Sequence, residues 1–418
     1  MNFLFLTPQL PYPPRQGAAI RNWGIMSELA TRHEVHLLSF GESGEVTPPG
    51  LASLTLLPSP TRTTATRLRE LLTSTEPDIA RRLASPDFAV ALARLLEQHR
   101  FDVVQVEGLE LVPYALPYLP ALLKSGRAAG SVPEGAAESR GRGLPKWVYD
   151  AHNAESDLQR SALLADARQP RRWHAALYSA LQTMKLQRYE AKILPRFGQV
   201  VAVSESDAAF LRGLSGVRPL VIPNGINTEA LTPTAAPTAA AMQARPGPTL
   251  LFTGKMDFRP NVDGVLWFVD EILPRLKLDG PPATLWVVGQ SLHPALERLR
   301  DDPQVVLTGW VDAVEPYLAA ADVVVVPLRM GSGTRLKVLQ ALSMARPLVG
   351  TTLGCAGLAL RDGVHLRLAD SPESFAAAIT ELLRDPSHAL EMGNVGRSHV
   401  QAHFDWRVLV PQLEEALR

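Results

Sequence analysis

The chain has 418 residues, with 42 Lys plus Arg against 42 Asp plus Glu, so its formal net charge is zero. That length exceeds one typical hydrophobic core and predicts two large domains, while the balanced charge excludes a globally basic nucleic-acid-binding protein. The single cysteine, Cys355, excludes an internal disulfide and a cysteine-rich metal cluster.

The N-terminal residues MNFLFLTPQL are apolar over a few positions only and have no basic leader before them. This pattern predicts a first strand rather than a signal peptide, and no later apolar run approaches the roughly 20 residues of a membrane-spanning helix. We therefore expect a cytoplasmic protein.

Short apolar runs that end in Gly, Pro, Ser or Asn alternate with helix-patterned segments along the whole chain. The candidate strands are residues 2–7, 34–40, 102–107, 147–152, 200–204, 219–223, 249–254, 284–289, 305–309, 322–327, 347–351 and 365–368. Such alternation is typical of βαβ winding and predicts an α/β fold with two Rossmann-like domains.

Residues 231–248 are rich in Pro, Ala and Thr and have no periodic apolar face, which is typical of a linker. We therefore predict an N-terminal domain over 1–230, a C-terminal domain over 249–400, and a C-terminal helix over 401–418 that packs back toward the first domain. Ligands of open parallel sheets bind at the carboxyl ends of the strands, so two such domains predict a cleft between them.

Residues 321–354 read as a strand, a glycine-rich turn, an amphipathic helix and a second strand. Gly331, Ser332 and Gly333 leave the backbone open for close approach by a ligand, and a helix starting near Thr334 points its positive end there. This arrangement predicts an anion site. Lys337 and Gln340 continue a polar row from Thr334 at helical spacing.

Three blocks in order, FTGKMDFRPNVDGVLWF, VVLTGWVDAVEPYLAAADVVVVPL and GSGTRLKVLQALSMARPLVGTT, resemble a known family. They are similar to the retaining glycosyltransferases of GT-B architecture, in the large group that includes sucrose and glycogen synthases. The likeness covers nearly the whole chain and is greatest to a bacterial branch that makes exopolysaccharide or other surface glycans. It implies two facing Rossmann-like domains, the second holding a nucleotide-diphosphate sugar.

The resemblance implies several donor-binding residues in the second domain. The family has two glutamates eight residues apart, and this chain has Ser332 and Gln340 at those positions. Gln340 keeps a carbonyl acceptor for a ribose hydroxyl. Gly331 and the backbone N–H groups of Gly333 and Thr334, together with Lys337, would then orient sugar and phosphate.

The family also carries a cationic pair after the first strand of this domain. Here Lys255 follows Gly254, and Arg259 stands one residue before the position of the family's second cation. Val311, in the segment GWVD, matches a position whose backbone holds the nucleotide base.

In the first domain, His152 follows a strand end where the family has a histidine near the transferred sugar. Gly17 and Arg21 match a loop that approaches the donor phosphates or the acceptor. The resemblance thus implies His152, Lys337 and Ser332 as catalytic residues, with Gly17 and Arg21 among the donor-binding ones.

The implied reaction transfers a sugar with retention from the nucleotide sugar, a co-substrate, to a glycan or lipid-linked acceptor. No Asp-x-Asp pair occurs, so we expect no metal ion and no further cofactor. The basic segment 169–197 fits either peripheral contact with the inner membrane face or a packed helix with solvated arginines.

Two alternatives remain open. Because Ser332 and Gln340 replace the glutamates, the chain could be an inactive partner that binds nucleotide sugar or scaffolds another transferase. A nucleotide-sugar 2-epimerase shares the architecture but should offer carboxylates for proton abstraction at the sugar, and the GSGTRLKVL block favours a transferase.

Overall fold

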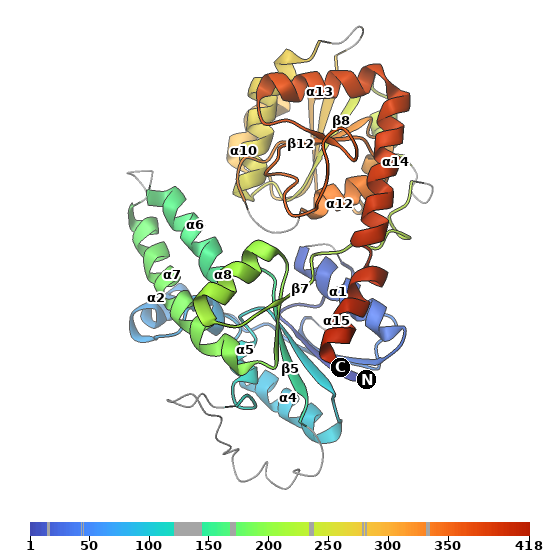
Figure 1. Ribbon diagram of the computed structural model, residues 1–418. Coiled ribbons are helices and arrows are strands. Elements are labelled where there is room, and N and C mark those ends of the chain that lie inside the picture. Colours follow the sequence, from blue (N-terminus) through green and yellow to red (C-terminus); the bar gives the residue numbers. More distant parts are fainter. Residues whose placement is uncertain are drawn as a thin grey trace. The chain divides into compact units, whose positions relative to one another are not determined.

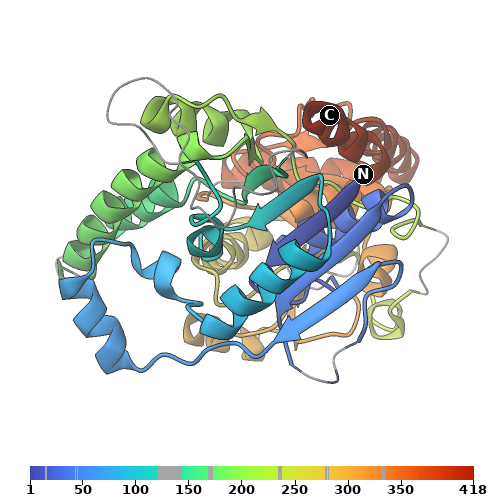
Figure 2. The same cartoon turned by 90° about the horizontal axis from the view of Figure 1, so that it is seen from below.

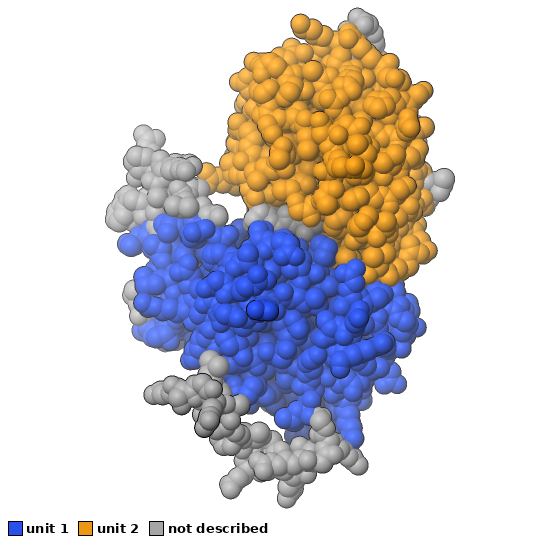
Figure 3. Space-filling view, in the orientation of Figure 1, with its two compact units in different colours: residues 1–223, 410–418 blue, residues 224–409 orange. Residues whose placement is uncertain are grey.

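The computed structural model describes residues 1–14, 17–42, 44, 46–120, 144–167, 173–233, 238–277, 280, 282–331 and 335–418. They form two compact units, unit 1 with residues 1–223 and 410–418, and unit 2 with residues 224–409 (Figure 3). The expected boundaries at residues 230, 249 and 401 differ from these limits. Part of the expected linker belongs to unit 2, because Leu231 and Met242 are buried in its core.

Unit 1 is built on a parallel sheet of seven strands in the order β3-β2-β1-β4-β5-β6-β7. The strands are β1 (Asn2–Thr7), β2 (Glu34–Phe40), β3 (Ser53–Leu57), β4 (Val103–Glu107), β5 (Lys146–Ala151), β6 (Gln199–Ala202) and β7 (Leu220–Val221). The order reverses between β1 and β4, as in a Rossmann fold. This switch point determines where the carboxyl ends of the strands can present side chains to a ligand.

Helices cover the sheet of unit 1 (Figure 1). They are α1 (Gly17–Ala30), α2 (Thr64–Thr73), α3 (Asp78–Arg81), α4 (Pro86–Gln98), α5 (Val112–Ala115), α6 (Glu155–Ala167), α7 (Trp173–Ile193), η3 (Leu194–Arg196) and α8 (Glu205–Ser215). Ser85 accepts a hydrogen bond from the N–H of Phe88 and so caps α4, whose apolar face packs on the sheet (Figure 2). The last residues of α15 (Trp406–Leu417) also belong to unit 1, where Lys146 Nζ donates to the carbonyl of Ala416 at 3.0 Å.

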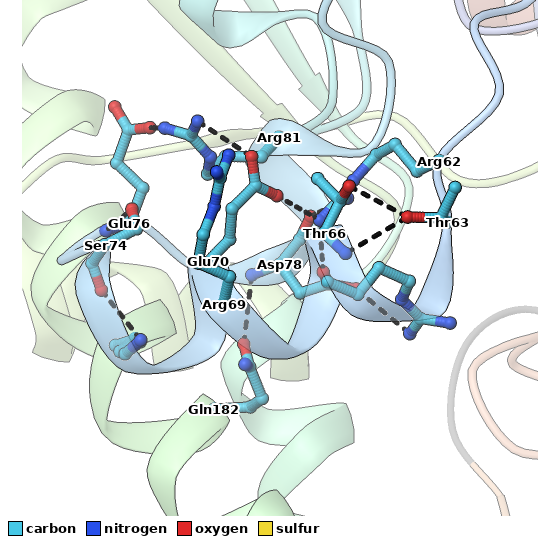
Figure 4. Close-up of polar contacts among 12 residues, drawn as sticks. Arg62, Thr63, Thr66, Arg69, Glu70, Ser74, Glu76, Asp78, Arg81 and Gln182 are labelled. Carbon is cyan, nitrogen blue, oxygen red and sulfur yellow. Dashed lines mark hydrogen bonds and ion pairs between the residues drawn. The ribbon is translucent and has the colours of Figure 1, made fainter.

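Ion pairs join α2 to α3, and hydrogen bonds attach these helices to α7 (Figure 4). Arg62 pairs with Asp78 at 2.9 Å, and Arg81 pairs with Glu70 at 3.0 Å. The N–H of Asp78 donates to Gln182 of α7 at 3.1 Å. These charges therefore fix a helical layer of unit 1 and take no part in the candidate sites described below.

Unit 2 repeats the same design with a parallel sheet of six strands in the order β10-β9-β8-β11-β12-β13. Its strands are β8 (Thr249–Thr253), β9 (Thr284–Val288), β10 (Val305–Gly309), β11 (Val323–Val326), β12 (Leu348–Gly350) and β13 (Arg367–Leu368). All four valines of β11 are buried, as expected for a central strand covered on both faces.

Helices surround the sheet of unit 2 (Figure 1). They are α9 (Ala240–Gln243), α10 (Arg259–Trp267), η4 (Phe268–Ile272), η5 (Leu273–Arg275), η6 (Pro294–Asp301), α11 (Glu315–Ala320), α12 (Leu336–Ser343), α13 (Pro372–Arg384) and α14 (Pro386–His403). The chain enters and leaves unit 2 side by side, since the N–H of Ile226 donates to the carbonyl of Phe404 at 2.8 Å. The predicted α/β class with two Rossmann-like domains is confirmed.

No helix within the described ranges is both long and apolar enough to cross a membrane.

Candidate functional site

The candidate site of unit 2 lies where the order of its strands reverses, between β8 and β11. The loop after β8 starts with Gly254, and the loop after β11 leads through Gly331 to Arg335, which precedes the first turn of α12. Carboxyl ends of adjacent parallel strands at a switch point are the usual ligand-binding place of an open α/β sheet. Gly331, the described glycine of the turn singled out in the sequence, therefore stands at such an edge.

Glycine is required at two of these strand ends. Gly254 has φ 151° and Gly289, directly after β9, has φ 155°. A Cβ atom on Gly289 would stand 1.7 Å from the carbonyl oxygen of Gly254, so no side chain fits there. The backbones of the two loops consequently approach each other without intervening side chains, next to Lys337 of α12.

Lys337 is the central cation of this site. Its Nζ donates a hydrogen bond of 2.8 Å to Oδ1 of Asn261 and lies 4.0 Å from the centroid of the Phe252 ring. Burial, with a smaller contribution from the neighbouring charge of Arg335, lowers the pKa of Lys337 to about 7. In the described part of the chain no carboxylate pairs with this ammonium, so its charge is available to an anion.

Arg335 brings a second cation to the start of α12. Its residue is 8% exposed, and its guanidinium occupies the side of Gly331, where a Cβ atom would lie 3.1 Å from Nη1. Burial lowers the pKa of this guanidinium. A buried and a partly buried cation beside the positive end of an eight-residue helix make a strongly anion-attracting environment.

The other predicted donor-binding residues of unit 2 lie in different surroundings. Lys255 is half exposed and pairs with Asp257 at 3.2 Å, and Arg259 is an exposed first residue of α10. Val311 is partly buried against the core of unit 2, and Gln340 is partly buried on α12. Three further predicted residues lie outside the described residues, namely Ser332, Gly333 and Thr334.

Unit 1 presents a second group of polar side chains at the ends of β4 and β5. His152 lies just after β5, and its Nε2 is 2.6 Å from Oε2 of Glu107, the last residue of β4. Glu107 is fully buried, and its other oxygen accepts a hydrogen bond from Gln105 at 2.6 Å. The carboxylate therefore orients the ring of the histidine that the family resemblance implied as a catalytic residue.

The pKa values of His152 and Glu107 are both raised above their ordinary values. Burial acts to lower the pKa of His152, but the hydrogen bond and charge of Glu107 outweigh it and raise the pKa. Burial and the charge of Asp150 raise the pKa of Glu107, against the opposite effect of His152. Both shifts favour a pair that keeps its proton.

Arg21, predicted as a donor-binding residue, is held by partners within unit 1. It lies in the interior of unit 1 at 1% exposure, where Nη2 and Nε form a double ion pair with Asp150 and Nη1 donates to the carbonyl of Ile222 at 2.9 Å. The guanidinium thus balances a buried carboxylate. Gly17, the other predicted residue of this loop, is the exposed first residue of α1.

Glu107, Asp150 and His152 also bring three possible metal-ligating atoms within 4.8 Å of one another. These residues do not suit a divalent ion, because Arg21 binds both carboxylate oxygens of Asp150 and its own charge would repel the ion. Among the described residues no other such set occurs.

Sequence reasoning missed Glu107, Arg335 and Asn261 as members of these sites. Glu107 ends a predicted strand next to the one that His152 follows, so its position at the same sheet edge was a usable signal. Asn261 gave no signal, because its partner Lys337 is 76 residues away.

Comparison with known proteins identifies the family. The model of glycosyltransferase family 4 matches residues 15–230, and that of group 1 glycosyl transferases matches residues 247–385. A GDP-mannose-dependent monoacylated alpha-(1-6)-phosphatidylinositol monomannoside mannosyltransferase of Corynebacterium glutamicum is 24% identical over 47% of this chain and 55% of its own length. A trehalose synthase of Rubrobacter xylanophilus is 39% identical over 24% of this chain and 23% of its own length. The matched part of the chain therefore spans 55% of the length of the first relative and 23% of the length of the second.

Solved structures share the fold along the entire chain. Sucrose-phosphate synthase of Thermosynechococcus elongatus has a TM-score of 0.69 at 17% identity and covers 99% of this chain and 98% of its own. HepE of Anabaena, solved with UDP and glucose, has a TM-score of 0.66 at 13% identity and covers 100% and 99%. With a family match over more than half of its length and this two-domain fold, the chain belongs to the group 1 glycosyltransferases of family 4, with GT-B architecture.

Proposed function

We propose that this chain transfers a sugar from a nucleotide-diphosphate sugar to a hydroxyl group of a glycan or lipid-linked acceptor, with retention of anomeric configuration. The observation that carries the proposal is the pair of cations at the start of α12, the buried Arg335 and the partly buried Lys337. A diphosphate suits such a pair because it carries two adjacent negative charges. Family membership supports the same substrate class.

In the proposed reaction, the bond from the anomeric carbon to the diphosphate oxygen breaks. The acceptor oxygen bonds to the same face of that carbon, and its proton passes to the departing phosphate. Negative charge grows on the diphosphate during this step, so Lys337, Arg335 and the positive end of α12 stabilise the transition state more than the ground state. We propose that these groups serve in place of a divalent metal ion and that no further cofactor takes part.

His152, paired with Glu107, is proposed to orient the transferred sugar by a hydrogen bond. Among the comparisons, one relative is named for its use of GDP-mannose and the HepE structure contains UDP and glucose. These names support a hexosyl donor. We propose that the protein acts in the cytoplasm, and that a lipid-linked acceptor would bring it to the inner face of the membrane.

Thermal unfolding across UDP-, GDP-, ADP- and dTDP-sugars, with and without EDTA, tests the proposal. A ligand that binds only the folded state raises the midpoint. We expect one nucleotide class to raise it without sensitivity to EDTA, and Lys337→Met to reduce the rise while the exposed Lys277→Met keeps it. NMR of the product then reports its anomeric configuration. An absence of stabilisation by every donor, or an inverted product, would contradict the proposal.

A second candidate, an inactive nucleotide-sugar-binding partner, is favoured by Gln340 and Ser332, which stand where the family has glutamates. Turnover assays on the wild-type chain and on Ser332→Glu with Gln340→Glu separate the two. Donor binding without turnover in the wild type, together with turnover in the double variant, would establish the inactive partner.

A further inference from the structure

Asn261 is a buried amide in the first turn of α10 whose two polar atoms are both engaged. The residue is 5% exposed. Its Oδ1 accepts a hydrogen bond of 2.8 Å from Nζ of Lys337, and its Nδ2 donates one of 2.9 Å to the carbonyl oxygen of Lys255. One side chain therefore joins the cation of α12 to the loop that carries the cation after β8.

The surroundings restrict this contact to one geometry. A Cβ atom on Gly254 would lie 2.7 Å from Nδ2 of Asn261 and 3.1 Å from Nζ of Lys337, so both groups occupy the space that this glycine leaves open. The Phe252 ring covers the ammonium from another side, with its centroid at 4.0 Å. A free lysine side chain has high rotamer entropy. Contacts that already hold the side chain reduce the conformational entropy that is lost when an anion binds.

We propose that Asn261 is the positioning residue of the phosphate-binding site, holding the ammonium of Lys337 and the backbone at Lys255 in place for the diphosphate of the donor. This inference rests on the proposed function, because it assumes that a nucleotide sugar is the anion. Asn261 acts through Lys337 and the loop and need not touch the substrate itself.

The neutral amide is chemically suited to this position. It offers the ammonium an acceptor but adds no negative charge, so Lys337 keeps its attraction for an anion. Aspartate has nearly the same shape but would form an ion pair with Lys337, offsetting its charge and raising its pKa above the present value of about 7. The variant Asn261→Asp therefore tests charge separately from shape.

The experiment titrates the full-length chain calorimetrically with UDP-glucose, GDP-mannose, ADP-glucose and dTDP-glucose, and with the matching free nucleosides. Asn261→Ala should weaken binding of the preferred nucleotide sugar by about ten- to a hundredfold, the usual value of a hydrogen bond to a charged group, and leave nucleoside binding unchanged. The exposed Asn394→Asp on α14 is the matched control for the charge change and should bind as the wild type does.

Asn261→Asp should also change the pH profile. Wild-type affinity should fall between about pH 6 and about pH 9 as Lys337 loses its proton, and in Asn261→Asp this fall should move to higher pH, from a weaker starting value. The diphosphate of a nucleotide sugar carries no proton that titrates in this range. A merely structural role of Asn261 would lower the unfolding midpoint without moving the profile.

A double-mutant cycle distinguishes loss of the contact with Lys337 from a general loss of folding. Asn261→Ala should cost much less affinity in the Lys337→Met background than in the wild type, because it acts through that ammonium. Equal costs in both backgrounds, or Asn261 variants with the affinity and pH profile of Asn394→Asp, would overturn the inference while leaving the proposed function intact. A wild-type chain that binds none of the four nucleotide sugars would instead overturn both.

Discussion

The imidazole of His152 lies 2.6 Å from the carboxylate of Glu107, with Nε2 and Oε2 as the contacting atoms. Glu107 ends β4 and His152 directly follows the neighbouring strand β5, so the pairing of the two strands brings the residues close. Glu107 is fully buried, whereas the His152 side chain keeps 17% of its surface exposed. Such a pair holds one oriented and protonatable ring at the edge of the sheet of unit 1.

Replacing Glu107 by glutamine should lower the pKa of His152. Burial alone acts to lower this pKa, and the hydrogen bond and charge of Glu107 are what raise it above 6.5. NMR titration of the imidazole signals, with His152 assigned through His152→Asn, measures the effect. An unchanged titration in Glu107→Gln would contradict it, and the exposed Glu391→Gln serves as control.

The contact between His152 and Glu107 should also make the free energy of unfolding depend on pH. Because the folded-state pKa of His152 is raised, its stabilising contribution is fully present below about 6.5 and is lost as the pH rises through the folded value. The difference in unfolding free energy between wild type and Glu107→Gln should shrink over that range.

Removing one partner of the ion pair between Arg21 and Asp150, and leaving the other, should strongly destabilise the fold. Both side chains are almost completely buried, at 1% and 0% exposure. Arg21→Met should therefore cost about 3–5 kcal/mol, because it leaves the Asp150 charge buried without its partner. Urea unfolding measures the cost.

Two further variants check this explanation. Arg21→Met with Asp150→Asn should recover much of the loss, and Arg298→Met, from an exposed pair with Asp270, should cost at most about 1 kcal/mol. If the double variant were as unstable as Arg21→Met alone, an unpaired charge would not be the cause.

Sequence patterns predicted the sheets well because the strands bury both faces. β11 is four consecutive valines, and its position follows directly from that run. The prediction missed β3 (Ser53–Leu57), an edge strand paired only with β2, whose five residues are all partly exposed. An edge strand with one polar face gives a weaker apolar signal than a central one.

The sites were less predictable because they depend on partners far apart in the chain. Spacing on a helix and family resemblance singled out Lys337, but nothing local indicates that Asn261 contacts it. Arg21 was expected to bind the donor, whereas Asp150, 129 residues away, pairs with it in the interior. Burial and pairing of this kind are properties of the packed fold and cannot be read from a loop motif.

Gly289 should tolerate no side chain. Its φ of 155° disfavours other residues, and a Cβ atom would meet the Gly254 carbonyl oxygen at 1.7 Å. Gly289→Ala should cost about 3 kcal/mol or more, since backbone strain and overpacking each reach about 1–3 kcal/mol. Gly213→Ala, in the exposed part of α8 with no atom near the added Cβ, should instead stabilise by about 0.5–1 kcal/mol. Similar unfolding midpoints for the two variants would contradict the close approach of the two loops.

Lys337 should lower the free energy of unfolding at low pH. Its pKa of about 7 lies below its ordinary value of 10.5, so below pH 7 the folded chain holds a buried charge at a cost in stability. Between about pH 7 and pH 10.5 the unfolded chain binds that proton and the folded chain does not, so wild-type stability should rise with pH over this range. Lys337→Met lacks this dependence and should be more stable than wild type at about pH 6, with the difference shrinking toward high pH. Urea unfolding of wild type, Lys337→Met and the exposed control Lys277→Met at several pH values measures it. A Lys337→Met chain less stable than wild type at low pH would mean that the ammonium stabilises the fold, and that its position does not reflect a ligand.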